Sequence, residues 1–280
     1  MNSEVLVRLA FFSGIFVGVA IWELLAPRRT LTTSKGMRWS GNLAVTFLNS
    51  LVVRLLFPVV PVGMALVAEQ RGWGALNNTG LPHWLEIVAG VAVLDLVIYL
   101  QHVMFHAVPV LWRLHMMHHA DLDFDVTTGL RFHPIEIILS LGIKLATVVV
   151  LGPPAAAVLI FEVLLNGTSM FNHGNISLPR GVDQRLRLLV VTPDMHRVHH
   201  SVAIRETNSN FGFNLPWWDR LMGTYRDQPA RGHEGMTIGL SQFRDARRLT
   251  LPWMLALPFT GKPGEYTLNR QGREPLGGGR

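Results

Sequence analysis

Histidines carry the clearest chemical signal in this sequence, because most of the twelve are bunched along the chain. They recur at spacings of three and four residues, which place side chains on one face of a helix. One His-x-x-x-His pair is followed by two copies of His-x-x-His-His. The three bunches are His102 and His106, then His115, His118 and His119, and finally His196, His199 and His200. This pattern predicts a metal centre built from helix faces.

The number of imidazoles indicates more than one metal ion. The three bunches supply eight ligands, which exceeds what one ion can hold, so we expect two ions with about four or five nitrogen ligands each. His173 is a natural ninth ligand. His133, in the motif His133-Pro134-x-Glu136, is either a ligand or a residue that supports one. Two further histidines are interpreted as ordinary residues, namely His83 and His233.

Carboxylates are expected beside such a site, because histidines alone offer no negative charge to offset two dications and need acceptors for their second N–H. The candidates are Asp95, Glu136 and Asp194. Asp95 and Tyr99 continue the first histidine pair as a polar stripe along an apolar helix, and an ionisable group within a membrane helix is usually functional. The alternative for Asp95 is a salt bridge between helices, for instance with Arg54 or Lys144.

The ligand type limits the chemistry without choosing the metal, since imidazole suits iron, copper, zinc and nickel. The absence of cysteine excludes disulfides, thiolate metal sites, iron–sulfur clusters and a cysteine nucleophile. Nucleotide-binding glycine loops, a Gly-x-Ser-x-Gly elbow and a His-Glu-x-x-His motif are also absent. Two irons that use O2 to oxidise a lipid C–H bond fit what remains. A divalent-metal transporter or binding protein and a two-zinc hydrolase are the alternatives.

The composition is that of a membrane protein. Of 280 residues, 49% are apolar and only 16% are charged, whereas a soluble domain has about 25% charged residues. This balance argues against a disordered chain, and no nucleic-acid motif accompanies the net charge of +6. Each helical crossing needs about 20 mostly apolar residues. Candidate crossings cover residues 5–25, 42–68, 84–108 and 135–171, and Gly152-Pro153-Pro154 breaks the last into a hairpin.

The predicted fold is therefore all-α: a multi-pass membrane bundle of about four transmembrane helices, the last pair a hairpin, with a helical cap that holds the di-metal site. Loop charges orient this bundle. The first loop holds four basic residues and the second only one, namely Arg28, Arg29, Lys35 and Arg38 against Arg71. The positive-inside rule makes the first loop cytoplasmic. We therefore expect a cytoplasmic metal site and a cytoplasmic cap from about His173 onward.

We expect residues 1–260 to form a single integral-membrane domain. Residues 241–259 begin basic and end apolar, which is typical of a helix at the membrane interface, although a helix packed on the cap is the alternative. Residues 261–280 are rich in Gly, Pro and Arg and are predicted to be a poorly ordered tail. The Gly-Pro-Pro break and residues 166–170 are expected to line a substrate channel.

Taken together, the motifs resemble the sterol desaturase / fatty acid hydroxylase superfamily of integral-membrane di-iron enzymes. The resemblance covers about residues 90–225. It rests on Asp95-x3-Tyr99-x2-His102-x3-His106, Leu111-Trp112-x2-His115-x2-His118-His119, His133-Pro134-x-Glu136, Asn172-His173-x-Asn175, Thr192-Pro193-x2-His196-x2-His199-His200-Ser201, Asn208-x-Asn210-x-Gly212 and Trp218-Asp219-x3-Gly223-Thr224.

This resemblance implies a hydroxylase core at about residues 90–225 that binds two iron ions and hydroxylates a lipid with O2. Desaturation by the same site is the alternative. By position, it implies that the three histidine bunches and His173 are ligands, whereas His133 stands where the family's ligand varies. It also implies electrons from a redox protein, either ferredoxin-like or cytochrome b5-like. Three basic cap residues are candidates to attract an acidic donor, namely Arg185, Arg187 and Arg197.

Overall fold

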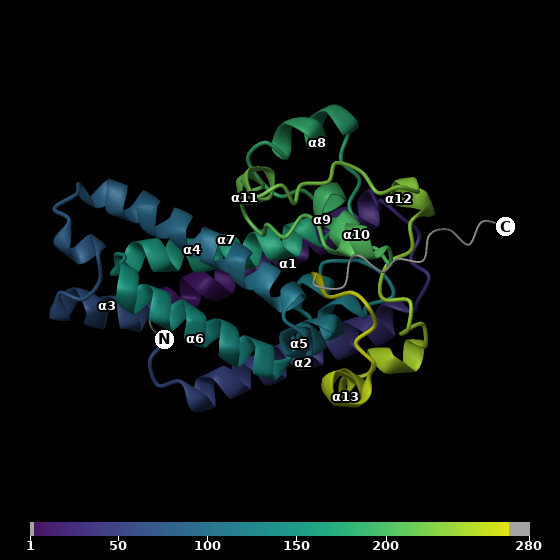
Figure 1. Cartoon of the computed structure of the whole chain (residues 1–280), viewed down its shortest axis with the longest axis horizontal. Helices are drawn as coiled ribbons and strands as arrows, with labels where there is room; N and C mark the ends of the chain where they lie inside the picture. Colours follow the sequence, from purple (N-terminus) through teal and green to yellow (C-terminus); the bar gives the residue numbers. More distant parts are fainter. Residues whose placement is uncertain (1–2, 269–280) are drawn as a thin grey trace.

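The computed structural model of the chain describes residues 3–268 and is built of helices, which confirms the predicted class. Within this range there is no β-strand. Two isolated β-bridges join loops, Pro27 with Ile176 and Ser201 with Ile238. In Figure 1 the long apolar helices run along the long axis, and the short helices of the C-terminal part gather towards one end.

Four of the long helices match the predicted crossings closely. They are α1 (Ser3–Leu25), α4 (His83–Ala107), α6 (Pro134–Leu151) and α7 (Ala155–Asn172). The predicted hairpin of α6 and α7 turns at Gly152, which adopts a left-handed conformation with φ of 63°. Pro153 and Pro154 follow at once, and proline cannot continue the hydrogen bonding of a helix. Local turn chemistry therefore determines where this hairpin folds.

The second predicted crossing, residues 42–68, is broken in the structure. It forms α2 (Lys35–Leu56) and α3 (Pro61–Arg71), separated by a segment that contains Pro58. A single helix is prevented because both Pro58 and Pro61 lack the amide hydrogen that an unbroken helix would use. Among the described residues, five helical segments are long and apolar enough to cross a membrane. The expected number was about four, and the difference arises because both arms of the hairpin reach 18 residues.

Helices α6 and α7 form the centre of the bundle. Helix α7 packs against α1, α3 and α4, and helix α6 packs against α2, α3 and α4. Their shared core includes Leu94, Val148 and Phe161. Many apolar side chains point away from this core, including Phe47 and Leu55, which are 72% and 73% exposed. An outward-facing apolar surface of this kind is what helices present to lipid.

Short helices cover one end of the bundle and form the predicted cap. They are α5 (Pro109–His119), α8 (Arg180–Leu186), α9 (Pro193–His199), α10 (Ile204–Thr207), α11 (Trp217–Leu221), α12 (Gly232–Gly235) and α13 (Leu251–Thr260), with single 3-10 turns at Thr128–Leu130 and Ala246–Leu249. A third 3-10 turn, Leu76–Asn78, lies at the opposite end of the bundle, beside Gly152. The loop after α1 lies at the same end as the cap. There Arg28 pairs with Asp194, and Arg29 donates to the carbonyl of Met236 at 2.7 Å.

The segment 241–259 is not one helix. Its basic part is a 3-10 turn, and only α13 is a regular helix, because Pro252 sits in its first turn. Met254 and Leu257 of α13 are buried, and α13 packs against α5 and α2, whereas Trp253 and Phe259 are exposed. Of the predicted tail, residues 261–268 pack on the cap through Tyr266, which is buried against Trp112. Residues 269–280 lie outside the described residues.

Candidate metal centre

Nine histidines come together at the junction of the bundle and the cap. They form two groups that could each hold a metal ion, and within each group the ligand nitrogens lie within 4.8 Å of one another. All nine side chains are buried. The five-histidine group contains His102, His106, His115, His119 and His199, and the four-histidine group contains His118, His173, His196 and His200.

The two His-x-x-His-His motifs share their residues between both groups. Helix α5 gives His115 and His119, one turn apart, to the five-histidine group and His118 to the other. The motif of α9 does the reverse, because its pair one turn apart, His196 and His200, joins the four-histidine group. Its third histidine joins the five-histidine group. The two motifs therefore interlock, and neither group can form from one motif alone.

Local structure sets the position of each segment that carries the clustered histidines. Helix α4 is long enough to place His102 and His106 on one face at its cap end. Pro193 occupies the first turn of α9, and the hydroxyl of Thr192 accepts the amide hydrogen of Met195 at 3.4 Å, which caps the helix. His173 follows directly after α7 as its C-terminal cap residue. Its position brings the hairpin into contact with the cap.

The outer nitrogen of several imidazoles donates to a fixed acceptor. The Nδ1–H groups of His102, His199 and His173 each donate to a backbone carbonyl at 2.7 Å, from Phe211, Ser209 and Ser169 respectively. His118 donates to the carbonyl of Arg131 at 3.2 Å, and His115 donates to the carboxylate of Glu136 at 2.7 Å. A neutral imidazole carries one proton, so the Nε2 atoms of these five rings are left as bare lone pairs.

Those bare nitrogens point at one another. The Nε2 atoms of His102 and His115 are 3.1 Å apart, and His173 Nε2 lies 3.2 Å from Nε2 of both His118 and His200. Facing lone pairs repel, and a cation between them removes the repulsion. Ligands at about 2.1 Å from a metal lie about 3 Å apart when their bonds are at right angles. The observed separations fit that arrangement.

Burial keeps the imidazoles in the form that binds metal. Desolvation lowers the pKa of His173 to about 3, and it also lowers the pKa values of His118, His196 and His200 well below the ordinary value. The neighbouring imidazoles lower the last three further. The rings are therefore neutral near pH 7, as metal ligands must be. Both ring nitrogens of His196 and the Nε2 atom of His199 are buried without a hydrogen-bond partner. Unpaired buried polar atoms are costly, so this donor set also fits metal ions.

The predicted supporting residues occupy different positions. Glu136 accepts from His115, as a supporting carboxylate would. Asp95 instead accepts from the indole of Trp218 at 2.8 Å and from the amide of Leu215, which rules out the alternative salt bridge with Arg54 or Lys144. Lys144 pairs with Glu162 within the bundle.

Two other predicted supporting residues, Tyr99 and Asp194, make no polar contact with the histidine groups among the described residues. The hydroxyl of Tyr99 contacts the hydroxyl of Thr224 at 2.8 Å, although its ring packs on Phe211. Asp194 forms ion pairs with Arg197 and Arg28. These residues hold the segments that carry the ligands.

His133 belongs to neither histidine group. Its Nδ1 atom accepts the amide hydrogen of Ile135 at 3.2 Å and so caps the start of α6. The presumed ordinary histidines lie elsewhere: His83 is exposed at the start of α4, and His233 lies 3.5 Å from a carboxylate oxygen of Asp194.

The expected channel lining is also different. Gly152 turns beside Trp73, at the end of the bundle where α4 begins, whereas the histidines of α4 lie at its other end. Thr168 donates to the side chain of Asn214, so this part of α7 contacts the cap. The Gly-Pro-Pro break is therefore a turn remote from the metal centre, and residues 166–170 join the bundle to the cap.

One side-chain acceptor was not singled out as a supporting residue. The Oδ1 atom of Asn208 lies 3.1 Å from His106 Nδ1, and the amide group of Asn208 donates to the carbonyl of Tyr266 at 2.7 Å, which fixes its orientation. The Asn208-x-Asn210 motif was the available signal. The backbone carbonyl acceptors left no signal in the sequence, because every residue has a carbonyl.

Nine buried imidazoles closed into two adjacent groups at the end of an apolar helical bundle define a class of histidine-rich membrane proteins whose clusters are consistent with a di-metal site. Residues 87–224 match the family model described as Fatty acid hydroxylase. Through this segment the chain belongs to the fatty acid hydroxylase family. It is therefore an oxidoreductase of the hydroxylase and monooxygenase kind, as its motifs predict.

Curated relatives agree with this assignment. The chain is 26% identical over 232 residues to ornithine lipid hydroxylase OlsE of Rhizobium tropici, which covers 79% of this chain and 69% of that protein. It is 26% identical over 165 residues to alkylglycerol monooxygenase of Homo sapiens, covering 57% and 34%. The Xenopus tropicalis alkylglycerol monooxygenase is 27% identical over 219 residues, covering 75% and 46%. The alignments thus span less than half of either alkylglycerol monooxygenase. No solved structure matches the chain significantly.

Proposed function

We propose that this protein is an O2-dependent membrane hydroxylase that binds two iron ions with its nine clustered histidines. The observation that carries the proposal is the convergence of nine buried imidazoles into two adjacent groups. Two bound iron ions would supply the oxidising chemistry that an unactivated C–H bond requires. The reaction consumes O2, two electrons and two protons, and it yields one hydroxylated product and one water molecule.

The residues around the histidines would orient the ligands and exclude water. Glu136 and Asn208 hold the outer nitrogens of two rings. Phe132 stacks on His118 with ring centres 4.5 Å apart, and Phe213 lies 5.0 Å from His102 while also belonging to the core of the bundle. These two rings make the bundle side of the histidine groups apolar. We therefore infer that an acyl or alkyl chain approaches from the bundle side.

A membrane lipid is the substrate class that we propose. The relatives are named for an ornithine lipid and for alkylglycerols, and both are lipids with a polar head. Hydroxylation is preferred over desaturation because the family and both relatives are named as hydroxylases or monooxygenases. The two relatives share the class of reaction in their names, but they are named for different lipids.

We further propose that the metal centre faces the cytoplasm and receives electrons from a separate donor protein. The loop after α1, with its basic residues, lies at the same end of the bundle as the cap, and basic loops stay on the cytoplasmic side. Two of the three arginines expected to attract a donor are buried, since Arg187 pairs with Asp183 and Arg197 with Asp194. Only Arg185 remains exposed for that role.

Metal analysis and oxygen consumption test the proposal together. The protein purified in lipid nanodiscs should contain about two irons per chain and should consume O2 when a reductant and lipid are supplied. Lipid mass spectrometry of cells that express it should show a species heavier by one oxygen atom. His199→Ala and His118→Ala, one from each group, should abolish the product, whereas His83→Ala, at the exposed start of α4, should not.

Three results would contradict this function. Turnover of a lipid under argon would indicate a hydrolase. Metal uptake into vesicles without O2 consumption would indicate a transporter. Full activity of His199→Ala would show that the five-histidine group is not the reaction centre.

A further inference from the structure

The two histidine groups are supported by different parts of the chain. The five-histidine group takes its acceptors mainly from residues 208–211, through Asn208, the carbonyl of Ser209 and the carbonyl of Phe211. The four-histidine group is supported by the loop 121–131 between α5 and α6. Each support is held by a buried carboxylate, and the two carboxylates are Asp219 and Asp121.

The loop 121–131 reaches the four-histidine group by three routes. The carbonyl of Arg131 accepts from His118. The carbonyl of Gly129 accepts from the hydroxyl of Ser169 at 2.9 Å, and the carbonyl of Ser169 in turn accepts from His173. The ring of Phe124 lies 5.3 Å from that of His173 and 5.0 Å from that of His200. A shift of this loop would therefore move the partners of three of the four histidines.

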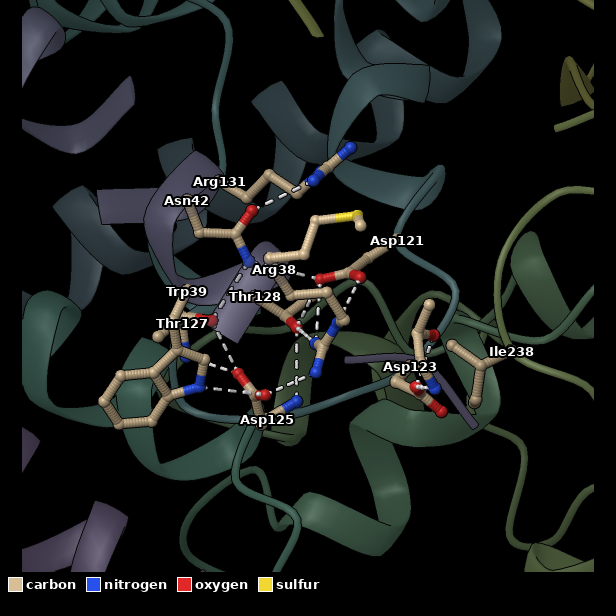
Figure 2. A network of polar contacts seen from close by, with 12 residues as sticks. Arg38, Trp39, Asn42, Asp121, Asp123, Asp125, Thr127, Thr128, Arg131 and Ile238 are labelled. Carbon is tan, nitrogen blue, oxygen red and sulfur yellow. Dashed lines mark hydrogen bonds and ion pairs between the residues drawn. The ribbon is translucent and has the colours of Figure 1, made fainter. Parts of the chain in front are cut away.

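Arg38 of α2 holds the loop in place, as Figure 2 shows. Its guanidinium group donates to both carboxylate oxygens of Asp121, at 2.7 and 2.9 Å, and also pairs with Asp125. It donates to the hydroxyl of Thr128 at 3.1 Å. All four side chains are buried. A bidentate arginine–carboxylate pair is strong and directional, so it fixes the register of the loop against α2.

Asn42, one turn along α2, joins this pair to Arg131. Its amide group donates to Asp121 at 3.3 Å, and its Oδ1 atom accepts from the Arg131 guanidinium at 2.9 Å. Arg131 also donates to the carbonyl of Met117 at 2.8 Å. The side chain of Arg131 is thus held at two points, of which Figure 2 shows the contact with Asn42. The backbone carbonyl of Arg131 is the acceptor for His118.

The charge of this network suits its position. The network joins two guanidinium groups, of Arg38 and Arg131, to the carboxylates of Asp121 and Asp125, so its charges balance. A charge-balanced network can be buried beside the four histidines because no ion in it is left without a partner.

Asp219 plays the corresponding part for the five-histidine group. Its carboxylate accepts from the amides of Phe211 at 2.8 Å and Gly212 at 2.9 Å, and from the hydroxyl of Thr224 at 2.7 Å. Phe211 is the residue whose carbonyl accepts from His102. The carboxylate therefore orients the peptide that carries this acceptor.

We propose that the two metal positions are held by separate positioning systems, the Arg38–Asp121 network for the four-histidine group and Asp219 for the five-histidine group. This inference rests on the proposed metal centre. Its consequence is that one position can be weakened while the other keeps its metal. Arg38, Asn42 and Asp219 are positioning residues, because none of them is among the two histidine groups.

Matched variants test the separation by counting metals. Arg38→Gln and Asp219→Asn each remove one buried charge from one network. The loss of such a supporting contact weakens metal binding about 10- to 100-fold. After dialysis against a chelator that leaves the wild type with two irons, each variant should retain about one. The magnetic coupling between the two irons should disappear from the spectrum of both variants.

Double variants identify which position is lost. Arg38→Gln combined with His196→Ala should still hold one iron, because both changes act on the four-histidine group, whereas Arg38→Gln with His199→Ala should hold almost none. Asp219→Asn combined with His199→Ala should still hold one iron, whereas Asp219→Asn with His196→Ala should hold almost none. Equal loss in all four double variants would overturn the inference, and so would two retained irons in both single variants.

Milder variants guard against simple misfolding. Thr128→Val removes one hydroxyl from the Arg38 network and keeps the size of the side chain, and Arg38→Lys keeps the charge but loses the two-pronged contact. Both should weaken only the four-histidine position, and Arg38→Lys less than Arg38→Gln. Loss from both positions in Thr128→Val would overturn the inference. A wild type without metal would refute the metal centre itself, whereas a two-iron wild type whose variants lose both metals equally would refute only the separation.

Discussion

The two ring nitrogens of a clustered histidine make different contacts. The inner nitrogen points to its group, while the outer nitrogen of most rings donates to an acceptor from another segment. An acceptor of this kind sets the tautomer and the ring orientation, and a carboxylate also makes the ring a stronger ligand. Glu136 is the one carboxylate seen to accept from a clustered histidine in the described part of the chain.

Replacing Glu136 by glutamine should therefore weaken metal binding while keeping the fold. Glutamine can still accept from His115, but it carries no negative charge to balance the metal. We expect metal retention against a chelator to fall about 10- to 100-fold. The measurement is iron content after chelator dialysis of Glu136→Gln.

The matched control for this prediction is His133→Ala, three residues earlier in the chain. His133 belongs to neither histidine group and caps α6, so its removal should lower stability by about 1 kcal/mol without loss of metal. Loss of one iron in His133→Ala would identify His133 as a ligand after all. Unchanged retention in Glu136→Gln would remove the supporting role of the carboxylate.

At the scale of elements, the hairpin of α6 and α7 depends on one residue. Gly152 has φ of 63°, and a Cβ atom there would lie 2.5 Å from the carbonyl oxygen of Trp73. Any other residue would face both a disfavoured backbone conformation and a close contact with backbone. Position 152 in the turn of the hairpin therefore requires glycine.

Gly152→Ala should destabilise the protein by about 1–3 kcal/mol. Gly142→Ala in α6 is the matched control, because a Cβ atom there meets open space and alanine favours a helix by up to about 1 kcal/mol. Thermal unfolding of both variants in one detergent gives the comparison. Equal unfolding temperatures for the two variants would show that the turn tolerates a side chain.

At the scale of the whole molecule, the cap extends beside the bundle as well as over its end. Trp218 of α11 donates to Asp95, which lies twelve residues after His83 at the start of α4. That distance is about 18 Å along the helix, less than the roughly 30 Å thickness of the hydrocarbon core. Exposed apolar residues of α11, such as Leu221 at 72%, therefore face lipid once α4 crosses the membrane.

Single-cysteine labels can test this placement, because the chain has no cysteine of its own. A fluorophore on Leu221→Cys in α11 or Phe259→Cys in α13 should be quenched by lipids with brominated acyl chains. The same fluorophore on Glu234→Cys in α12, an exposed site on the cap, should not be quenched. Equal quenching at all three positions would contradict the placement of the cap beside the membrane.

Much of this molecule could be predicted from local patterns in its sequence. The limits of α1 and α4, the hairpin at Gly152 and the presence of a many-histidine metal centre follow from apolar length, turn residues and helical spacing. These signals depend on residues that are close in the sequence, so they can be recognised without the structure. The break between α2 and α3 falls inside the crossing predicted at residues 42–68, although its prolines are plainly visible in the sequence.

Tertiary structure alone decided how the histidines are shared and what supports them. The exchange of His118 and His199 between the two groups depends on how α9, which packs on α7, brings its histidines against those of α4 and α5, and no local spacing encodes that contact. Backbone acceptors and the burial of Arg197 likewise depend on segments far apart in the chain. The sequence by itself determined the clustered histidines and the helices that carry them. The packing of those helices determined which histidines meet, because a contact between distant segments is set by the shape and charge of both.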